Sequence, residues 1–225
     1  MRIVYRDEHL LAVDKPSGLA VHRGWVDDAD TAVDRARVIA NTQVFPAHRL
    51  DRGTSGVLLF ALSSKVAARL GEIFTANEAQ KTYRAIVRGH PPVEGLVDHP
   101  VRRGEERDSP RVPARTAFTR LSTCEHPREG ERPLRYAWIE ARPETGRLHQ
   151  IRRHMKHLSH PIVGDVRYGK REHNHLCRER FGLARLALHA CTLSLIHPVT
   201  GVSLLFESPL PDDLGLPLAA MGLLI

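Results

Sequence analysis

A carboxylate stands between two arginines immediately before an apolar run. Asp51 lies between Arg49 and Arg52, and the small residues 53–56 predict a turn that leads into a buried strand over residues 57–62. Neighbouring positive charges favour the ionised form of an acid, and an ionised carboxylate is what nucleophilic catalysis requires. The same residues are also typical of an ordinary turn aspartate that hydrogen-bonds its own backbone.

Arg152 is a second residue with chemical potential, because a helical pattern covers residues 148–158. At about 100° per residue, four apolar residues share one stripe and are expected to be buried: Leu148, Ile151, Met155 and Leu158. Three polar residues share the adjoining stripe: His149, Arg152 and Lys156. Arg152 therefore starts at the edge of the core and is a candidate partner for Asp51, although a solvated helix shoulder gives the same pattern.

Tyr83 lies in a predicted strand over residues 82–87. A period of two places Tyr83, Ala85 and Val87 on one face of that strand. A half-buried strand tyrosine is the default interpretation, and core packing alone would account for it.

Five stretches of the chain together resemble the motifs of the RluA family of pseudouridine synthases. They occur in the family's order: residues 13–18, 48–56, 81–89, 145–154 and 160–165. The resemblance extends from about Ile3 to Phe206, which is nearly the whole chain. It implies an enzyme that isomerises uridine to pseudouridine in RNA without a cofactor.

The resemblance also implies roles for individual residues. Asp51 matches the catalytic aspartate, Tyr83 a tyrosine that lies against the target base and moves a proton, and Arg152 the arginine that pairs with the aspartate. Arg49 matches a residue that fills the gap left by an extruded base. The remaining residues expected to bind substrate are Arg147, His149, Gln150 and Leu188, the last by packing on the flipped uracil.

Within the family, the closest likeness is to enzymes that modify uridine-65 of tRNA. Residues 21–25, 181–183 and 185–190 carry this likeness. Ribosomal RNA is the alternative substrate, and a catalytically inactive RNA-binding relative is an alternative of another class. Retention of Asp51 and its two partner residues favours catalysis over the inactive relative. The chain ends at Ile225, without the longer tail associated with the tRNA enzymes.

The composition favours a polyanionic partner. The formal net charge is +7 and the sequence pI is about 9.8, and 28 of the 33 basic residues are arginines. Arginine contacts phosphates through two donors and stacks on bases, which suits RNA, although a genomic bias toward arginine codons explains part of the excess. Basic residues in two segments, 102–111 and 149–156, are expected to grip a folded RNA.

The fold class expected from the pattern is mixed α/β with much antiparallel pairing. Helices are expected over residues 31–41, 65–77 and 148–158, and exposed loops over 102–113 and 125–133. Ser63 and Ser64 are expected to cap the second helix, whose apolar face is formed by Val66, Leu70, Ile73 and Phe74. Eight strands are expected, over residues 3–5, 10–13, 57–62, 82–87, 115–121, 135–141, 186–196 and 203–206. We expect one catalytic domain over residues 1–225, with its core at 3–206 and no separate N-terminal RNA-binding domain.

Cysteine and histidine usage does not favour a disulfide framework or a metal site. Three cysteines, Cys124, Cys177 and Cys191, form no CxxC pair. Two sets of residues have spacings that would suit zinc: His154, His157 and His160, and His173, His175 and Cys177. We expect the first set to face RNA or end a helix and the second to lie in a charged loop, so no metal is expected. Without a signal peptide or a membrane-length apolar run, the chain is expected to be cytoplasmic.

Overall fold

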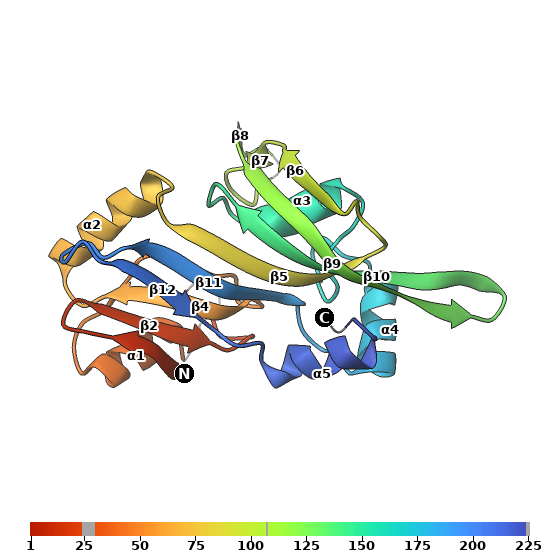
Figure 1. Cartoon of the computed structure of the whole chain (residues 1–225), viewed down its shortest axis with the longest axis horizontal. Helices are drawn as coiled ribbons and strands as arrows, with labels where there is room; N and C mark the ends of the chain where they lie inside the picture. Colours follow the sequence, from red (N-terminus) through yellow and green to blue (C-terminus); the bar gives the residue numbers. More distant parts are fainter. Residues whose placement is uncertain (24–29, 107, 224–225) are drawn as a thin grey trace. The chain divides into compact units, whose positions relative to one another are not determined.

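The computed structural model describes residues 1–23, 30–106 and 108–223, which form two compact units (Figure 1). Unit 1 comprises Met1–Lys81 and His189–Pro209, and unit 2 comprises Thr82–Leu188 and Leu210–Ile225. Gly24 and Trp25, which belong to the stretch 21–25 noted above, lie outside the described residues, as do Arg107 and Ile225. The single catalytic domain expected from the sequence stays a prediction, and the two units are described separately.

Unit 1 is built on a mixed sheet. Strands β1 (Arg2–Arg6), β2 (Leu10–Lys15) and β4 (Ser55–Ala61) pair antiparallel in that order, and the short β3 (Phe45–Pro46) also pairs antiparallel with β4. Strand β11 (Leu188–Ile196) runs parallel to β4, and β12 (Ser203–Glu207) pairs antiparallel with β11. All seven residues of β4 are buried, as expected of an uninterrupted apolar run.

Two capped helices pack on this sheet, α1 (Ala32–Ala40) on β2 and α2 (Ser64–Thr75) on β4. The backbone N–H of Asp34 donates to the Thr31 hydroxyl at the start of α1, and that of Val66 donates to the Ser63 hydroxyl at the start of α2. Both helices and the Ser63 cap are as the sequence predicted. The apolar face expected for α2 is also confirmed, because Val66 and Leu70 are buried and Ile73 and Phe74 pack against the same core.

Unit 2 is built on an antiparallel sheet whose strands follow the order β5 (Gln80–Arg88), β10 (Glu131–Pro143), β9 (Arg115–Arg128) and β6 (Glu94–Asp98). Strands β9 and β10 form a long hairpin, drawn in green in Figure 1. Tyr136 and Trp138 of β10 are fully buried in the core of this unit. A separate two-stranded hairpin joins β7 (Val101–Arg102) to β8 (Arg111–Val112).

Three helices complete unit 2: α3 (Gln150–His157), α4 (Arg171–Phe181) and α5 (Asp212–Ala220). The apolar stripe expected on α3 is confirmed for three of its four residues, since Ile151 and Met155 are buried and Leu158 packs against the core, whereas Leu148 precedes the helix and is only half-buried. The mixed α/β class with largely antiparallel pairing is also confirmed. Among the described residues, no helix is both long and apolar enough to span a membrane.

Two predicted loops are in fact regular structure. Residues 125–133 are mostly the ends of β9 and β10, where alternating exposed side chains on an outer hairpin look like a solvated loop in the sequence. The segment that holds His173, His175 and Cys177 is helix α4 rather than a charged loop. Because only Cys177 and Phe181 of α4 are buried, the helix has too narrow an apolar stripe for the pattern to indicate it.

Candidate active site

Asp51 lies in the turn that leads into β4, as its sequence context predicted. The backbone N–H of Thr54 donates to the Asp51 carbonyl oxygen at 3.0 Å, which closes the turn. The Asp51 side chain is half-buried, while Arg49 and Arg52 on either side are exposed. The predicted turn is shorter than expected, because Ser55 and Gly56 already belong to β4.

A segment that follows β2 holds this turn in place. Lys15 is fully buried, and its ammonium group donates to the carbonyl oxygens of Pro16 at 3.0 Å, Leu19 at 2.8 Å and Arg52 at 3.2 Å. The Ser17 hydroxyl donates to the Gly53 carbonyl at 2.7 Å, and the same segment adds a backbone bond to Arg52. A buried ammonium is costly unless it is hydrogen-bonded, so these contacts both satisfy Lys15 and position the backbone beside Asp51. The pattern of the sequence alone does not indicate this role.

The start of β4 is packed too closely for any residue but glycine at position 56. Gly56 has a φ of +114°, and a Cβ built on it would lie 2.1 Å from the carbonyl oxygen of Ala190 on β11. Beside it, Ser55 Oγ and His189 Nδ1 are 2.8 Å apart, and His189 Nε2 lies 3.1 Å from the Ser208 carbonyl oxygen. Because a carbonyl can only accept, Nε2 carries the proton and the Ser55 hydroxyl donates to Nδ1. The strand that follows Asp51 is therefore fixed by side-chain as well as backbone bonds.

His48, three residues before Asp51, acts as a neutral hydrogen-bond acceptor. Its Nε2 receives the backbone N–H of Leu59 at 3.2 Å, and its ring stacks on Phe74 with centroids 5.1 Å apart. Burial, followed by the nearby charge of Lys81, lowers the pKa of His48 to about 3. A neutral ring with an available lone pair is what the bond to Leu59 requires, so burial and bonding agree.

In unit 2, Arg152 is held by a partner that the sequence did not indicate. Its Nε donates to Asp165 Oδ2 at 2.7 Å and its Nη2 to Asp165 Oδ1 at 2.9 Å, and both side chains are buried. The backbone N–H groups of Arg167 and Tyr168 also donate to Asp165, each at 2.9 Å. Burial alone would raise the pKa of Asp165, but the bonds from Arg152 and the two N–H groups outweigh it and lower that pKa below its usual value. The expected pairing of Arg152 with Asp51 stays a prediction.

Tyr83 lies on β5, where its backbone is paired with Ala141 of β10. Its side chain is half-buried and packs against the core of unit 2, as predicted for a strand tyrosine. The face assignment was too simple, because Ile86 is buried as fully as its neighbours Ala85 and Val87. Both faces of β5 are therefore covered over that stretch.

A sequence model of the family described as RNA pseudouridylate synthase matches residues 9–157. The match covers more than half of the chain and includes Asp51, Tyr83 and Arg152. The chain belongs to the RNA pseudouridylate synthase family. The family resemblance inferred from the motifs is thus confirmed, together with the enzyme class, an isomerase that converts uridine to pseudouridine.

Named relatives and solved structures agree with this assignment. The synthase is 42% identical to tRNA pseudouridine synthase C of Vibrio parahaemolyticus serotype O3:K6, over 94% of this chain and 91% of that protein. It is also 42% identical to the protein of the same name from Vibrio cholerae serotype O1, over 94% and 92%. Its fold is similar to that of human RNA pseudouridylate synthase domain containing 4, with a TM-score of 0.76, 27% identity, and coverage of 98% of this chain and 93% of that one.

Among the other residues expected to bind substrate, Gln150 of the synthase is hydrogen-bonded within the protein. It is buried, and its amide donates to the Arg115 carbonyl and the Thr116 hydroxyl, each at 2.9 Å. Its amide oxygen accepts from the Thr145 hydroxyl and the Arg147 backbone. These bonds favour a role in positioning the start of α3 over direct contact with RNA.

The remaining four expected substrate residues differ in exposure. Arg49 and Arg147 are exposed, and Arg147 Nε donates to the Pro113 carbonyl at 3.2 Å. His149 is half-buried, with Nδ1 3.1 Å from the Tyr168 hydroxyl. Leu188, at the start of β11, is buried in the core of unit 2. Their roles in binding RNA stay predictions.

The histidines in and after α3, which were expected to face RNA or end a helix, differ in their surroundings. His154 is fully buried, with Nε2 donating to the His99 carbonyl and Nδ1 accepting from the Thr116 hydroxyl, each at 2.9 Å. His160 Nδ1 donates to the Arg88 carbonyl at 2.8 Å. The expectation that His154 faces RNA is therefore wrong, because its two ring nitrogens bond to the Thr116 side chain and the His99 backbone. The alternative, a helix-terminal position, is confirmed, since His154 lies in the last turn of α3. Within the described ranges, no three His, Cys, Asp or Glu side chains come together as a metal would need.

Proposed function

We propose that this synthase isomerises uridine-65 of tRNA. The supporting observation is the identity of about 42%, along almost the full length of both chains, with proteins named tRNA pseudouridine synthase C. The position within tRNA rests on the motif likeness described for the sequence. The net charge of +7 is consistent with a polyanionic substrate. We also propose that the protein is cytoplasmic.

The reaction needs few groups because its atoms balance within the substrate. The bond between N1 of uracil and C1′ of ribose breaks, the uracil turns, and a bond forms between C5 and C1′. C5 loses its proton and N1 ends with one, so no electrons enter or leave. The protein must therefore supply a group that assists cleavage, a group that moves a proton, and a pocket that retains the uracil.

We assign the first role to Asp51. An ionised carboxylate can attack the sugar or the base, or assist loss of the C2′ proton through a glycal intermediate. The contacts from Lys15, Ser17 and Gly18 hold the backbone next to Asp51, which keeps the carboxylate in one place. Fixed positioning is worth a large part of an enzyme's rate acceleration.

We assign proton transfer from C5 to Tyr83 and orientation of the carboxylate to Arg152. Tyr83 is held by strand pairing and core packing, and it is only half-buried, so part of its side chain is available for the base. The bidentate bond with Asp165 fixes the plane of the Arg152 guanidinium. A fixed plane lets the group present its remaining donor edge in one direction. No cofactor is part of the proposal.

A uridine in a stem must leave the base stack before Asp51 can reach it. Extrusion costs a few kcal/mol of unstacking and unpairing, and a side chain inserted at the vacated position offsets part of this cost. We assign insertion to Arg49, whose long flat side chain is exposed beside Asp51. Leu188 is proposed to pack against the flipped uracil.

Conversion of defined RNAs by the purified protein tests the proposal. Unmodified tRNA transcripts and ribosomal RNA fragments are incubated separately with the protein, and pseudouridine is mapped by carbodiimide labelling and primer extension. We expect conversion at uridine-65 of tRNA and little conversion of ribosomal RNA. Site-specific conversion of a ribosomal RNA fragment with tRNA untouched would contradict the tRNA substrate while leaving the enzyme class intact. No conversion of either RNA, with RNA binding retained, would favour the inactive binder.

A further inference from the structure

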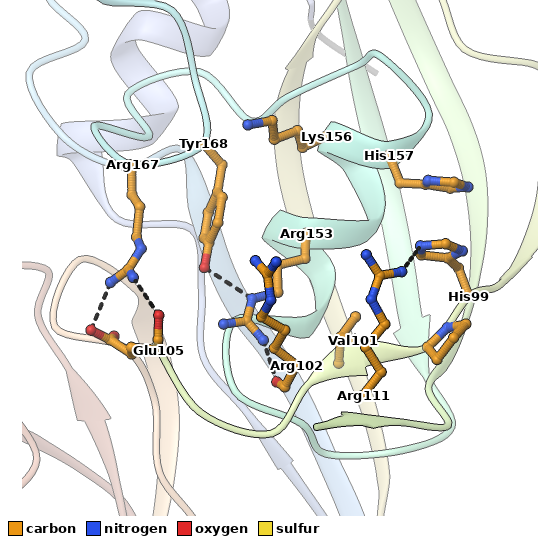
Figure 2. A pocket seen from close by; sticks show the side chains of 11 residues that line it. His99, Val101, Arg102, Glu105, Arg111, Arg153, Lys156, His157, Arg167 and Tyr168 are labelled. Carbon is orange, nitrogen blue, oxygen red and sulfur yellow. Dashed lines mark hydrogen bonds and ion pairs between the residues drawn. The ribbon is translucent and has the colours of Figure 1, made fainter. Parts of the chain in front are cut away.

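A pocket of about 430 Å³ lies in unit 2 between the β7–β8 hairpin, helix α3 and the segment at Arg167 and Tyr168 (Figure 2). Its volume falls within the usual range for ligand pockets. Five of the lining residues are Arg or Lys, whereas only one, Glu105, is acidic. The pocket is therefore strongly electropositive, and four of its five basic residues come from the two segments, 102–111 and 149–156, that are expected to grip RNA.

The single acid does not neutralise the pocket, because it is already paired. Arg167 Nη1 lies 2.7 Å from Glu105 Oε2, and Figure 2 shows this ion pair on one wall. Three other lining residues, Arg102, Arg111 and Lys156, are exposed, and within the described ranges none of them has an ion pair. These three side chains leave an excess of positive charge that faces the open volume.

Hydrogen bonds from Arg153 hold the walls of the pocket together. Arg153 donates to the backbone carbonyl of Arg102, to that of Gly104 at 2.9 Å, and to the Tyr168 hydroxyl at 2.9 Å. One side chain of α3 therefore ties the hairpin to the segment that carries Tyr168. Such ties keep the positive groups together at fixed positions, although like charges repel one another.

Tyr168 contributes to the same arrangement. The guanidinium of Arg167 lies 5.8 Å from the centre of its ring, and the ammonium of Lys156 lies 6.0 Å from it. The negative face of an aromatic ring attracts cations and partly offsets their repulsion. A carboxylate at this place would neutralise the cations, whereas the uncharged tyrosine ring stabilises them and leaves the site positive.

Two stacked histidines complete the pocket. The rings of His99 and His157 lie 3.7 Å apart at 11°, and Arg111 Nη1 is 3.4 Å from His99 Nε2. Burial, His157 and Arg111 lower the pKa of His99, in that order. The lowered pKa disfavours the charged form of His99, so this ring adds little to the positive charge that Arg and Lys give the pocket.

We propose that this pocket binds backbone phosphates of the RNA substrate, with Arg111 and Lys156 as the direct contacts. The proposal rests on the proposed function for the identity of the ligand. The chemistry of the pocket fits this ligand, since fixed Arg and Lys groups around an open volume are how proteins hold phosphodiesters. Such contacts position an RNA and carry no sequence information, so the pocket would serve affinity rather than choice of base.

The test compares Arg111→Gln, Lys156→Gln and the double variant with wild type. The affinity for unmodified tRNA is measured by fluorescence anisotropy over a series of KCl concentrations, and the conversion rate is measured at saturating enzyme. Loss of one phosphate contact reduces the slope of the logarithm of the binding constant against the logarithm of the salt concentration by about one. It also weakens binding equally for different RNA sequences. We expect this change for each single variant and about twice the change for the double variant, with the saturated conversion rate unaltered.

Arg132→Gln is the matched control. Arg132 is an exposed arginine on β10 of unit 2, and its substitution removes one positive charge, as each pocket substitution does. Pocket variants that retain wild-type affinity and salt dependence, or that change no more than Arg132→Gln, would overturn the proposal. A fall in saturated conversion rate without a change in affinity would do the same, because it would place these groups in the chemistry. Since binding and conversion are measured separately, a failure to convert uridine-65 would count against the proposed function alone.

Discussion

Arg152 and Asp165 form a buried, doubly hydrogen-bonded ion pair in which Nε meets Oδ2 at 2.7 Å and Nη2 meets Oδ1 at 2.9 Å. The two partners are thirteen positions apart in the chain, and both lie in motifs that resemble those of the family. Because Asp165 is also fastened by two backbone N–H groups, it is a rigid support for the guanidinium. The pair therefore links the fourth and fifth family motifs into one piece of structure.

Replacing Arg152 by alanine should lower turnover more than RNA affinity. The side chain is buried against a carboxylate, so its loss removes an orienting group rather than a phosphate contact. It also leaves Asp165 buried without its partner, which typically costs about 3–5 kcal/mol of folding free energy. Single-turnover rates, tRNA affinity and urea unfolding measure the three effects.

Asp165→Asn tests whether Asp165 acts by orienting Arg152, because the variant leaves Arg152 in place. The amide keeps the shape but weakens the bonds to Arg152, so we expect a partial loss of turnover and of stability. A variant of Arg152 that loses only salt-dependent affinity, with full turnover when saturated, would instead make this arginine a backbone contact.

Lys15→Met should reduce turnover with little effect on RNA affinity. The methionine keeps the apolar stem but removes the three donors that hold Pro16, Leu19 and Arg52, so the turn that carries Asp51 loses its fastening. Ser17→Ala is the milder comparison, because it removes only the bond to Gly53. Single-turnover assays on both variants should show rates that fall in the order wild type, Ser17→Ala, Lys15→Met. Unfolding curves confirm that the variants are folded. Equal rates in all three would contradict a positioning role.

The contrast between α2 and His48 shows what could be predicted from the sequence. The apolar spacing of α2 and its Ser63 cap are local, so the pattern predicts them correctly. The neutral state of His48 depends on burial and on Leu59, eleven residues away, which no local pattern contains. The same holds for Lys15, whose hydrogen bond to Arg52 spans 37 residues. Motif resemblance indicated that these residues matter, but only the folded chain shows what they contact.

The stability of the protein should fall between pH 7 and pH 5 because of His48. Its pKa is 6.5 when unfolded and about 3 when folded, so below pH 6.5 the unfolded state binds the extra proton and is favoured. The loss is at most about 1.4 kcal/mol per pH unit in this range. Asp165, whose pKa is lowered, contributes stability that is lost only as the pH falls below the usual range of carboxyl groups.

Urea unfolding at pH 7 and pH 5 checks this expectation. His48→Asn cannot take up a proton, so its loss of stability over this range should be smaller than that of wild type by up to about 2 kcal/mol. His22→Asn, at an exposed histidine, is the control and should behave as wild type. An identical pH dependence in wild type and His48→Asn would show that His48 does not become harder to protonate on folding.

Asp51→Asn should abolish isomerisation and leave RNA binding largely intact. An amide has nearly the shape of the carboxylate but neither its negative charge nor its nucleophilicity. Asp212→Asn makes the same chemical change at an exposed position on α5 and should retain full activity. Pseudouridine formation and tRNA affinity are measured on the same preparations, and full activity of Asp51→Asn would contradict the assignment of Asp51.

An isolated T-arm should react more slowly than whole tRNA. Both present uridine-65 in the same stem, and extrusion of the base costs a few kcal/mol in either RNA. Whole tRNA offers more backbone phosphates to a basic surface, so binding supplies more of the free energy that extrusion requires. We expect the ratio of conversion efficiencies, measured as kcat/KM, to favour whole tRNA and to shrink at high salt, where phosphate contacts weaken. A T-arm that reacts as efficiently as whole tRNA at every salt concentration would mean that the stem alone is recognised, and that contacts elsewhere on the tRNA add nothing to catalysis.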